Sequence, residues 1–200
     1  MSDILEKQKK ELDFEYKHGF SMPERATHKT EKGLNQDIVN EISGLKSEPE
    51  WMTKKRLQGL EFFEKKDMPK WGPDLSGIPF DDLTYFLRAT DEQKQTWDEL
   101  PPEIKETYDK IGVPEAEQKF LGGVSAQYES EVVYEKVNEE LKKQGVIFCD
   151  MDTAVKKYPE IVQEYFGTLI PSADNKFAAL NAAVWSGGSF VYVPKGAKVS

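Results

Sequence analysis

The stretch NKFAALNAAVWSGGSFVYVPKGAKVS (175–200) constrains the fold most, because its hydrophobic period changes part-way along. Apolar residues recur every three or four positions from Phe177, which predicts a helix that Asp174 caps. Gly187 and Gly188 then break the helical pattern, and SFVYVP alternates as a strand does. We therefore expect an α+β fold in which a new β architecture begins within the last residues.

The preceding residues predict mainly helices. Asn35 suits the cap of a helix that carries apolar residues on one side, and Gly59 weakens the helix that follows it. Pro102 suits a first helical position, with Gly112 as the stop. Asp152 is expected to cap a later helix. The helices expected besides those are 1–17, 114–122, 128–145 (ended by Gly145) and 159–167.

Three stretches do not predict a helix. Residues 18–33 have no hydrophobic period and are expected to be a mobile linker, so that 1–33 form a flexible N-terminal segment. Residues 67–80 hold prolines and glycines and predict an extended loop, with Trp71 packed onto the helices. FDDLTYFLRA (80–89) fits a short helix or a strand.

The composition excludes several classes of function. A net charge of −9 makes the chain a poor partner for nucleic acid. No apolar run is long enough to span a membrane, and the first residues lack the apolar core of a signal peptide. One cysteine, Cys149, forms no intramolecular disulfide and indicates a reducing, cytoplasmic compartment.

Few residues could carry chemistry. Cys149 lies in VIFC, which predicts a buried strand, so we interpret it as a small hydrophobe and only a weak candidate for metal binding. His18 and His28 show no metal-ligand spacing with it. The glycine pairs at 122–123 and 187–188 lack P-loop spacing and are expected to stop helices, and the adjacent acids at 81–82 and 139–140 suit a solvated face. No residue is therefore predicted to be catalytic or to bind a cofactor.

Long segments nevertheless resemble a known family. MPKWGPDLS, GVPEAEQKFLGGVSAQYESEVVY, QGVIFCDMDTA and EYFGTLIPSADNKFAALNAAVWSGGSFVYVPKG are similar to the SufB/SufD family of the SUF iron–sulfur cluster assembly machinery, and within it to SufB, the scaffold subunit. The resemblance implies a helical N-terminal region followed by a right-handed parallel β-helix and a C-terminal helical region. It divides this chain into a helical domain (34–170) and an incomplete start of the β-helix core (171–200).

The resemblance also implies a function. It indicates a non-catalytic, cytoplasmic scaffold that holds an iron–sulfur cluster transiently and works with the SufC ATPase and with SufD or a second SufB. The family's sulfur-handling cysteine and its SufC contact lie in regions beyond this chain, which the resemblance identifies as the front portion of a longer protein. The alternative is an isolated helical protein-interaction domain without cluster-assembly activity, and a third possibility is a sulfur acceptor that uses Cys149. Without further β-helix coils, the strand Phe190–Val193 is expected to have both edges unpaired.

Overall fold

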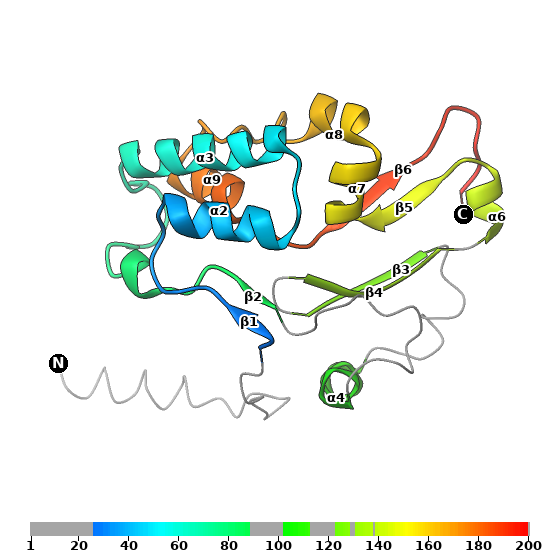
Figure 1. Ribbon diagram of the computed structural model, residues 1–200, viewed down its shortest axis with the longest axis horizontal. Coiled ribbons are helices and arrows are strands. Elements are labelled where there is room, and N and C mark those ends of the chain that lie inside the picture. The colour runs from blue at the N-terminus through cyan, green and yellow to red at the C-terminus, as the bar shows by residue number, and fades with distance from the viewer. Residues whose placement is uncertain (1–25, 89–101, 113–122, 129–130, 138, 200) are drawn as a thin grey trace.

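The structure is a computed structural model that describes residues 26–88, 102–112, 123–128, 131–137 and 139–199 (Figure 1). Helices predominate, accompanied by short antiparallel strands. In chain order the elements are β1 (His28–Lys29), α2 (Gln36–Leu45), α3 (Glu50–Lys65), the 3-10 helix η1 (Phe80–Asp82), β2 (Leu87–Arg88), α4 (Pro102–Ile111), β3 (Gly123–Tyr128), β4 (Glu131–Val137), α6 (Glu139–Lys143), β5 (Ile147–Asp150), α7 (Met151–Lys157), α8 (Pro159–Tyr165), α9 (Lys176–Val184) and β6 (Ser189–Tyr192). No helix in these ranges is both long and apolar enough to cross a bilayer.

Helices α2, α3 and α9 pack together on one side of the molecule (Figure 1). α3 and α9 come close together at Gly59, where an added Cβ would lie 2.8 Å from the backbone nitrogen of Ala183 and 2.9 Å from the Cβ of Ala182. Gly59 was expected only to weaken α3. The structure explains the glycine, because only a residue without a side chain lets the backbones of α3 and α9 come this close.

α3 and α9 also cap each other. Lys176, the first residue of α9, donates from Nζ to the carbonyl oxygens of Phe63 (2.6 Å) and Lys66 (2.9 Å) at the end of α3. Arg56 of α3 donates to the carbonyl oxygen of Ala183 (3.1 Å) at the end of α9. The last carbonyls of a helix have no partner within it and carry partial negative charge, so a cation at each end satisfies them. The reciprocal pattern shows that the two helices run antiparallel.

The starts of α2, α7 and α9 agree with the sequence to within two residues. Asn35 caps α2 as predicted, since its side chain accepts from a backbone N–H of the first turn. Asn175, rather than Asp174, caps α9, and Asp150, rather than Asp152, caps α7. Both predictions were wrong because a cap needs extended backbone angles, which Asn175 and Asp150 adopt, and the sequence offers two adjacent or near-adjacent candidates in each case.

The strands expected at VIFC and SFVYVP are confirmed as β5 and β6, but their pairing differs from the expectation. They form an antiparallel ladder in which Cys149 lies opposite Phe190, so β5 occupies one edge of β6. The prediction that Phe190–Val193 has both edges unpaired is therefore wrong. In the ranges that the structure describes, the strands form two-stranded antiparallel sheets and no parallel β-helix coil is seen.

The β3–β4 hairpin replaces part of a predicted helix. The sequence EVVYEKV was assigned to a helix over 128–145, whereas residues 131–137 form β4 and pair with β3. Adjacent valines and a tyrosine favour a strand. The three positions that were interpreted as one helical face, Tyr134, Val137 and Leu141, belong to two elements, since the first two lie in β4 and the third in α6. The helix begins only at Glu139, and Gly145 follows it with a positive φ of 80°, as predicted for a stop. Gly123 begins β3 instead of ending a helix, and the predicted helix over 114–122 lies outside the described residues.

The segment before α2 is not free of regular structure. His28–Lys29 pair with Leu87–Arg88, and Thr30 beside them is buried. A local pattern does not reveal such a pairing, because the partner strand lies far along the chain. The flexibility proposed for residues 1–33 stays a prediction, and the expected helix over 1–17 lies outside the described residues.

The loop that follows α3 is mostly as expected. Residues 67–79 contain no regular element, and residues 80–88 hold both a short helix, η1, and a strand, β2. Trp71 was predicted to pack onto the helices, but its exposed fraction is 66%, so that prediction is wrong. The neighbouring glycine, Gly72, has φ 86°, a left-handed backbone conformation that favours glycine. α4 begins at Pro102 and stops at Gly112 (φ 81°), as predicted.

Candidate functional site

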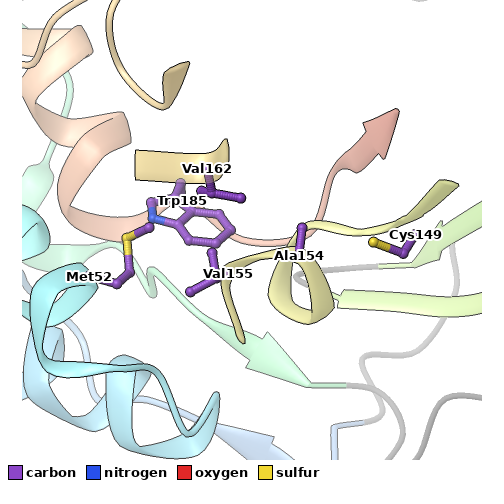
Figure 2. Packing of buried hydrophobic residues seen from close by; sticks show 6 residues of the cluster. All are labelled: Met52, Cys149, Ala154, Val155, Val162 and Trp185. Carbon is purple, nitrogen blue, oxygen red and sulfur yellow. The ribbon is translucent and has the colours of Figure 1, made fainter. Parts of the chain in front are cut away.

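Cys149 lies in the interior of the molecule. It is 6% exposed on β5 and belongs to the cluster drawn in Figure 2, whose other members are Met52, Ala154, Val155, Val162 and Trp185. Figure 2 shows Trp185 in the middle of the cluster and Cys149 at its strand end. This environment is that of a small hydrophobic side chain. Within the described residues, no three or more His, Cys, Asp or Glu side chains are grouped so that they could hold a metal ion.

His28 has a structural partner. Its Nε2 lies 2.8 Å from Oε1 of Glu41, and this contact joins β1 to α2. His18, the other histidine, lies outside the described residues. The structure does not bring His28 together with Cys149 as a set of metal ligands.

A buried ion pair lies between α3 and the end of α9. Arg56 is fully buried, and its guanidinium holds Glu48 by two hydrogen bonds of 2.7 and 2.6 Å. It also donates to the carbonyl oxygen of Trp185 at 3.0 Å, and Cζ lies 4.5 Å from the centroid of the Trp185 ring. The sequence analysis missed this arginine. The available signal was its position on the apolar stripe of α3, four residues after Met52 and four before Leu60.

A second buried cation lies near the same tryptophan. Lys46 has a fully buried side chain whose Nζ lies 2.7 Å from Oδ2 of Asp152. The same Nζ lies 5.4 Å from the ring centroid of Phe86 and 5.9 Å from that of Trp185. Asp152, predicted to cap a helix, instead neutralises this lysine. The two ion pairs connect the α2–α3 turn to α7 and to the end of α9.

A strained turn orients both pairs. Ser47 follows α2 with φ 50°, the left-handed region that non-glycine residues rarely adopt. The N–H groups of Ser47 and Glu48 bond to the carbonyls of Gly44 (2.9 Å) and Ser43 (3.0 Å), which is a Schellman motif with serine in the place of glycine. The motif directs Lys46 and Glu48, which flank Ser47, to different partners. Because the charges are paired and mostly buried, this cluster holds elements together and presents no reactive group to a substrate.

The exposed candidate site is an apolar surface. On the α8–α9 connection, Leu169 is 96% exposed, and Tyr165 and Ile170 are also largely exposed. A hollow of about 320 Å³ adjoins them, and it is lined by Lys55, Gln58, Tyr165, Phe166, Gly167, Leu169, Ile170, Ser172, Ala178, Asn181 and Ala182. Exposed aliphatic side chains beside a hollow are typical of protein-interaction sites. We name the three residues Tyr165, Leu169 and Ile170 the connection patch.

The ionisation of Tyr165 is shifted by its neighbours. The pKa of Tyr165 is raised above its ordinary value, chiefly by a hydrogen bond to the Glu164 side chain and then by the negative charge of Glu164. Tyr192 of β6 adds a smaller effect in the same direction. Val191 and Val193 of the β6 segment are exposed as well. Exposed apolar residues therefore occur both in the connection patch and at the last strand.

The fold and the site together define a mostly helical domain with an exposed apolar surface. Comparison with known proteins supplies the family. Residues 94–200 match the family model described as "SufBD protein N-terminal region", and this match covers more than half of the chain. The chain belongs to the SufBD family.

Two of the most similar relatives come from staphylococci. Each is named "Iron-sulfur cluster assembly SufBD family protein", one from Staphylococcus haemolyticus (strain JCSC1435) and one from Staphylococcus aureus (strain USA300). Both are 54% identical to this chain over 185 residues, which are 92% of the chain and 40% of the relative. The chain thus spans about two fifths of the length of the curated relatives that it matches. The family-level part of the resemblance in the sequence is confirmed.

Proposed function

We propose that this chain is part of a SufB-type scaffold subunit for iron–sulfur cluster assembly. The observation that carries the proposal is the match to the SufBD N-terminal region together with relatives named for iron–sulfur cluster assembly. The partners are the SufC ATPase and SufD or a second SufB, in the cytoplasm. The cluster is a transient cargo of the full-length protein, and the residues of this chain contribute no catalytic step.

The structure supports a binding role for this region. The connection patch offers exposed apolar area beside a hollow, whereas the charged residues of the interior are paired with each other. Cys149 is a poor sulfur acceptor in this fold, because a persulfide transfer needs an accessible thiolate and the residue is 6% exposed. The role that fits these observations is to position other proteins.

A second candidate is an isolated helical interaction domain without cluster-assembly activity. The observation that favours it is the exposed apolar surface beside a hollow, which suits partner binding and requires no cluster. In that case the surface would bind a partner, but no cluster would be delivered. The two candidate functions predict different activities of the enzymes that receive iron–sulfur clusters, and they predict the same binding of partners.

The binding half of the proposal is tested with a chimera. The matched 185 residues of the S. haemolyticus relative are replaced by this chain, and the affinity-tagged chimera is purified from cells that express SufC and SufD. We expect both proteins to co-purify, and we expect Leu169→Lys to reduce the yield of SufD while the yield of SufC, whose contact the resemblance places beyond this chain, stays unchanged. Val199→Lys is the matched control, because it adds the same charge at another exposed apolar residue away from the connection patch. A folded chimera that retains neither partner would contradict the proposal.

A further inference from the structure

The junction between α9 and β6 has little of its own to fix its path. Trp185 follows the last residue of α9, and residues 186–188 lead from it to the start of β6. Gly187 has φ 65° and Gly188 has φ 101°, in the left-handed region that glycine adopts freely. Two consecutive glycines lose much conformational freedom on folding, so contacts with other elements must hold this junction in one shape.

The junction is held at both ends. On the α9 side, Arg56 of α3 donates from Nη2 to the carbonyl oxygen of Trp185 at 3.0 Å and from Nη1 to that of Ala183 at 3.1 Å. On the β6 side, the N–H of Met151 donates to the carbonyl oxygen of Gly188 at 2.9 Å. The path of the chain into β6 is therefore set from outside the junction, by residues of α3 and α7.

Arg56 holds the junction in place because its own position is fixed. Glu48 accepts two hydrogen bonds from it, Nε to Oε2 at 2.7 Å and Nη2 to Oε1 at 2.6 Å, and both side chains are buried. The same Nη2 donates to Glu48 and to the carbonyl oxygen of Trp185. A planar guanidinium directs several donors at a carboxylate and at carbonyls together, which a lysine ammonium does not reproduce. The contact with Trp185 therefore depends on the shape of arginine as well as on its charge.

We propose that Gly187 and Gly188 form a hinge and that Arg56 is its latch. While Arg56 holds the Trp185 carbonyl, β6 stays paired with β5. When that hydrogen bond opens, the glycine junction turns and β6 separates from β5, while helices α2, α3 and α9 stay folded. Local openings of this kind break few contacts and occur at a lower free energy than global unfolding. The inference does not rest on the proposed function.

The one cysteine of the chain reports this opening. Cys149 of β5 lies opposite Phe190 of β6, and the side chains of directly opposed residues share one face of a ladder. Phe190 also packs against the buried cluster that contains Cys149 and Trp185 and that Figure 2 draws. Separation of β6 removes Phe190 and uncovers the thiol. The rate at which Cys149 is labelled therefore measures how often the latch opens.

The first test labels Cys149 with a disulfide reagent in the whole chain and in the Arg56→Lys variant. Lysine keeps a cation beside Glu48 but loses the planar fork, so we expect labelling to be roughly tenfold faster or more, the factor that one lost hydrogen bond to a charged group corresponds to. A local opening exposes little surface, so this rate should change little at low concentrations of urea.

Phe63→Leu is the control for a general loss of stability. Phe63 is buried, and its ring lies 4.2 Å from Nζ of Lys176, at the opposite end of α9 from the junction. The variant lowers stability without a change at the hinge or the latch. Any faster labelling of Cys149 in it should come through global unfolding, which rises steeply with urea. Circular dichroism confirms that each variant is folded.

Gly188→Ala tests the hinge. An added Cβ would lie 3.9 Å from the Cβ of Met151, which is an ordinary contact, so the substitution acts through the backbone. Alanine disfavours φ 101° and thus the closed junction, so Cys149 should again be labelled faster. Gly112→Ala is the matched control, because Gly112 also has a positive φ, 81°, and nothing lies within 4 Å of an added Cβ. It follows α4 and should leave the labelling rate unchanged.

The wild-type chain provides a test that needs no substitution. Its slow labelling should be insensitive to low concentrations of urea, because it proceeds through the local opening. Labelling that rises with urea from the lowest concentrations overturns the proposal, because Cys149 would then be reached only by global unfolding. So does a folded Arg56→Lys chain that is labelled at the wild-type rate, or one whose labelling rises with urea as steeply as that of Phe63→Leu.

Discussion

Replacing Gly59 with alanine tests how closely α3 and α9 pack. The new Cβ would lie 2.8 Å from the backbone nitrogen of Ala183, 2.9 Å from the Cβ of Ala182 and 3.0 Å from the carbonyl oxygen of Ala179. Two of these three atoms belong to the backbone, so no side-chain rotation relieves the contact. The two helices must separate, and the packing that Gly59 permits is lost.

The magnitude is the difference of two effects. Overpacking a tight interface by one methyl group costs about 1–3 kcal/mol, and a backbone clash belongs at the upper end. Alanine in place of glycine inside a helix raises the free energy of unfolding by about 1 kcal/mol. We therefore expect Gly59→Ala to lower the free energy of unfolding by about 1–2 kcal/mol.

Gly44 provides a matched control in the same protein. It lies in α2, and an added Cβ there would meet no atom within 4 Å. Gly44→Ala should raise the free energy of unfolding by roughly 0.5–1 kcal/mol. Urea denaturation followed by circular dichroism measures both variants. If Gly59→Ala proves as stabilising as Gly44→Ala, the two helices do not approach each other as described.

Three further predictions concern single side chains. Cys149→Ala should cost about 1–2 kcal/mol of unfolding free energy through lost burial, and the native thiol should react slowly with a disulfide reagent; fast reaction would show that Cys149 is accessible. Arg56→Met should lower the free energy of unfolding by about 3–5 kcal/mol, because it leaves Glu48 buried without its partner. In denaturant titrations, the double variant with Glu48→Gln should be more stable than Arg56→Met alone. Equal stability of the two variants would refute this explanation. The pKa of Tyr165 is raised in the folded protein, so this tyrosine stabilises the fold at pH values below the pKa it has in the unfolded chain, and the contribution is lost as pH rises through the folded pKa. Glu164→Gln should lower the pH at which the tyrosinate absorbance appears. An unchanged transition would contradict the assignment of the shift to Glu164.

Features set by neighbouring residues were predictable from the sequence. Asn35 marked a helix start, Gly112 and Gly145 marked helix stops, and VIFC and SFVYVP marked strands. Each of these signals acts within one turn of helix or one strand, where sequence spacing and spatial distance coincide. Caps were misplaced by one or two residues where two capping side chains compete, as with Asp174 and Asn175.

Features set by distant partners were not predictable. The pairing of β6 with β5 depends on where a segment about forty residues earlier comes to lie, and no local pattern records it. The same is true of Arg56, whose burial depends on Glu48 and on the end of α9. Gly59 looked like a weak point of α3 because its reason lies in another helix. Long-range packing decides all three positions.

The family assignment came from a different kind of information. Long segments of the sequence resemble the family as a whole, independently of which side chains meet in the fold, and the match of residues 94–200 to the SufBD N-terminal region agrees with this resemblance. The candidate surface did not come from that resemblance. Leu169 and Ile170 look in the sequence like any apolar residues, and only their exposed fractions identify them as unusual.

The central claim is that this chain supplies the N-terminal part of a cluster-assembly scaffold. It is tested most directly by expressing the S. haemolyticus relative with its matched region replaced by this chain, in cells depleted of their own SufBD proteins, and by measuring the activity of a [4Fe–4S] enzyme. The account predicts that the chimera restores this activity and that Cys149→Ala in the chimera leaves it largely intact. A chimera that folds and retains SufC but restores no activity would contradict the claim, and it would favour an interaction domain without a role in cluster assembly.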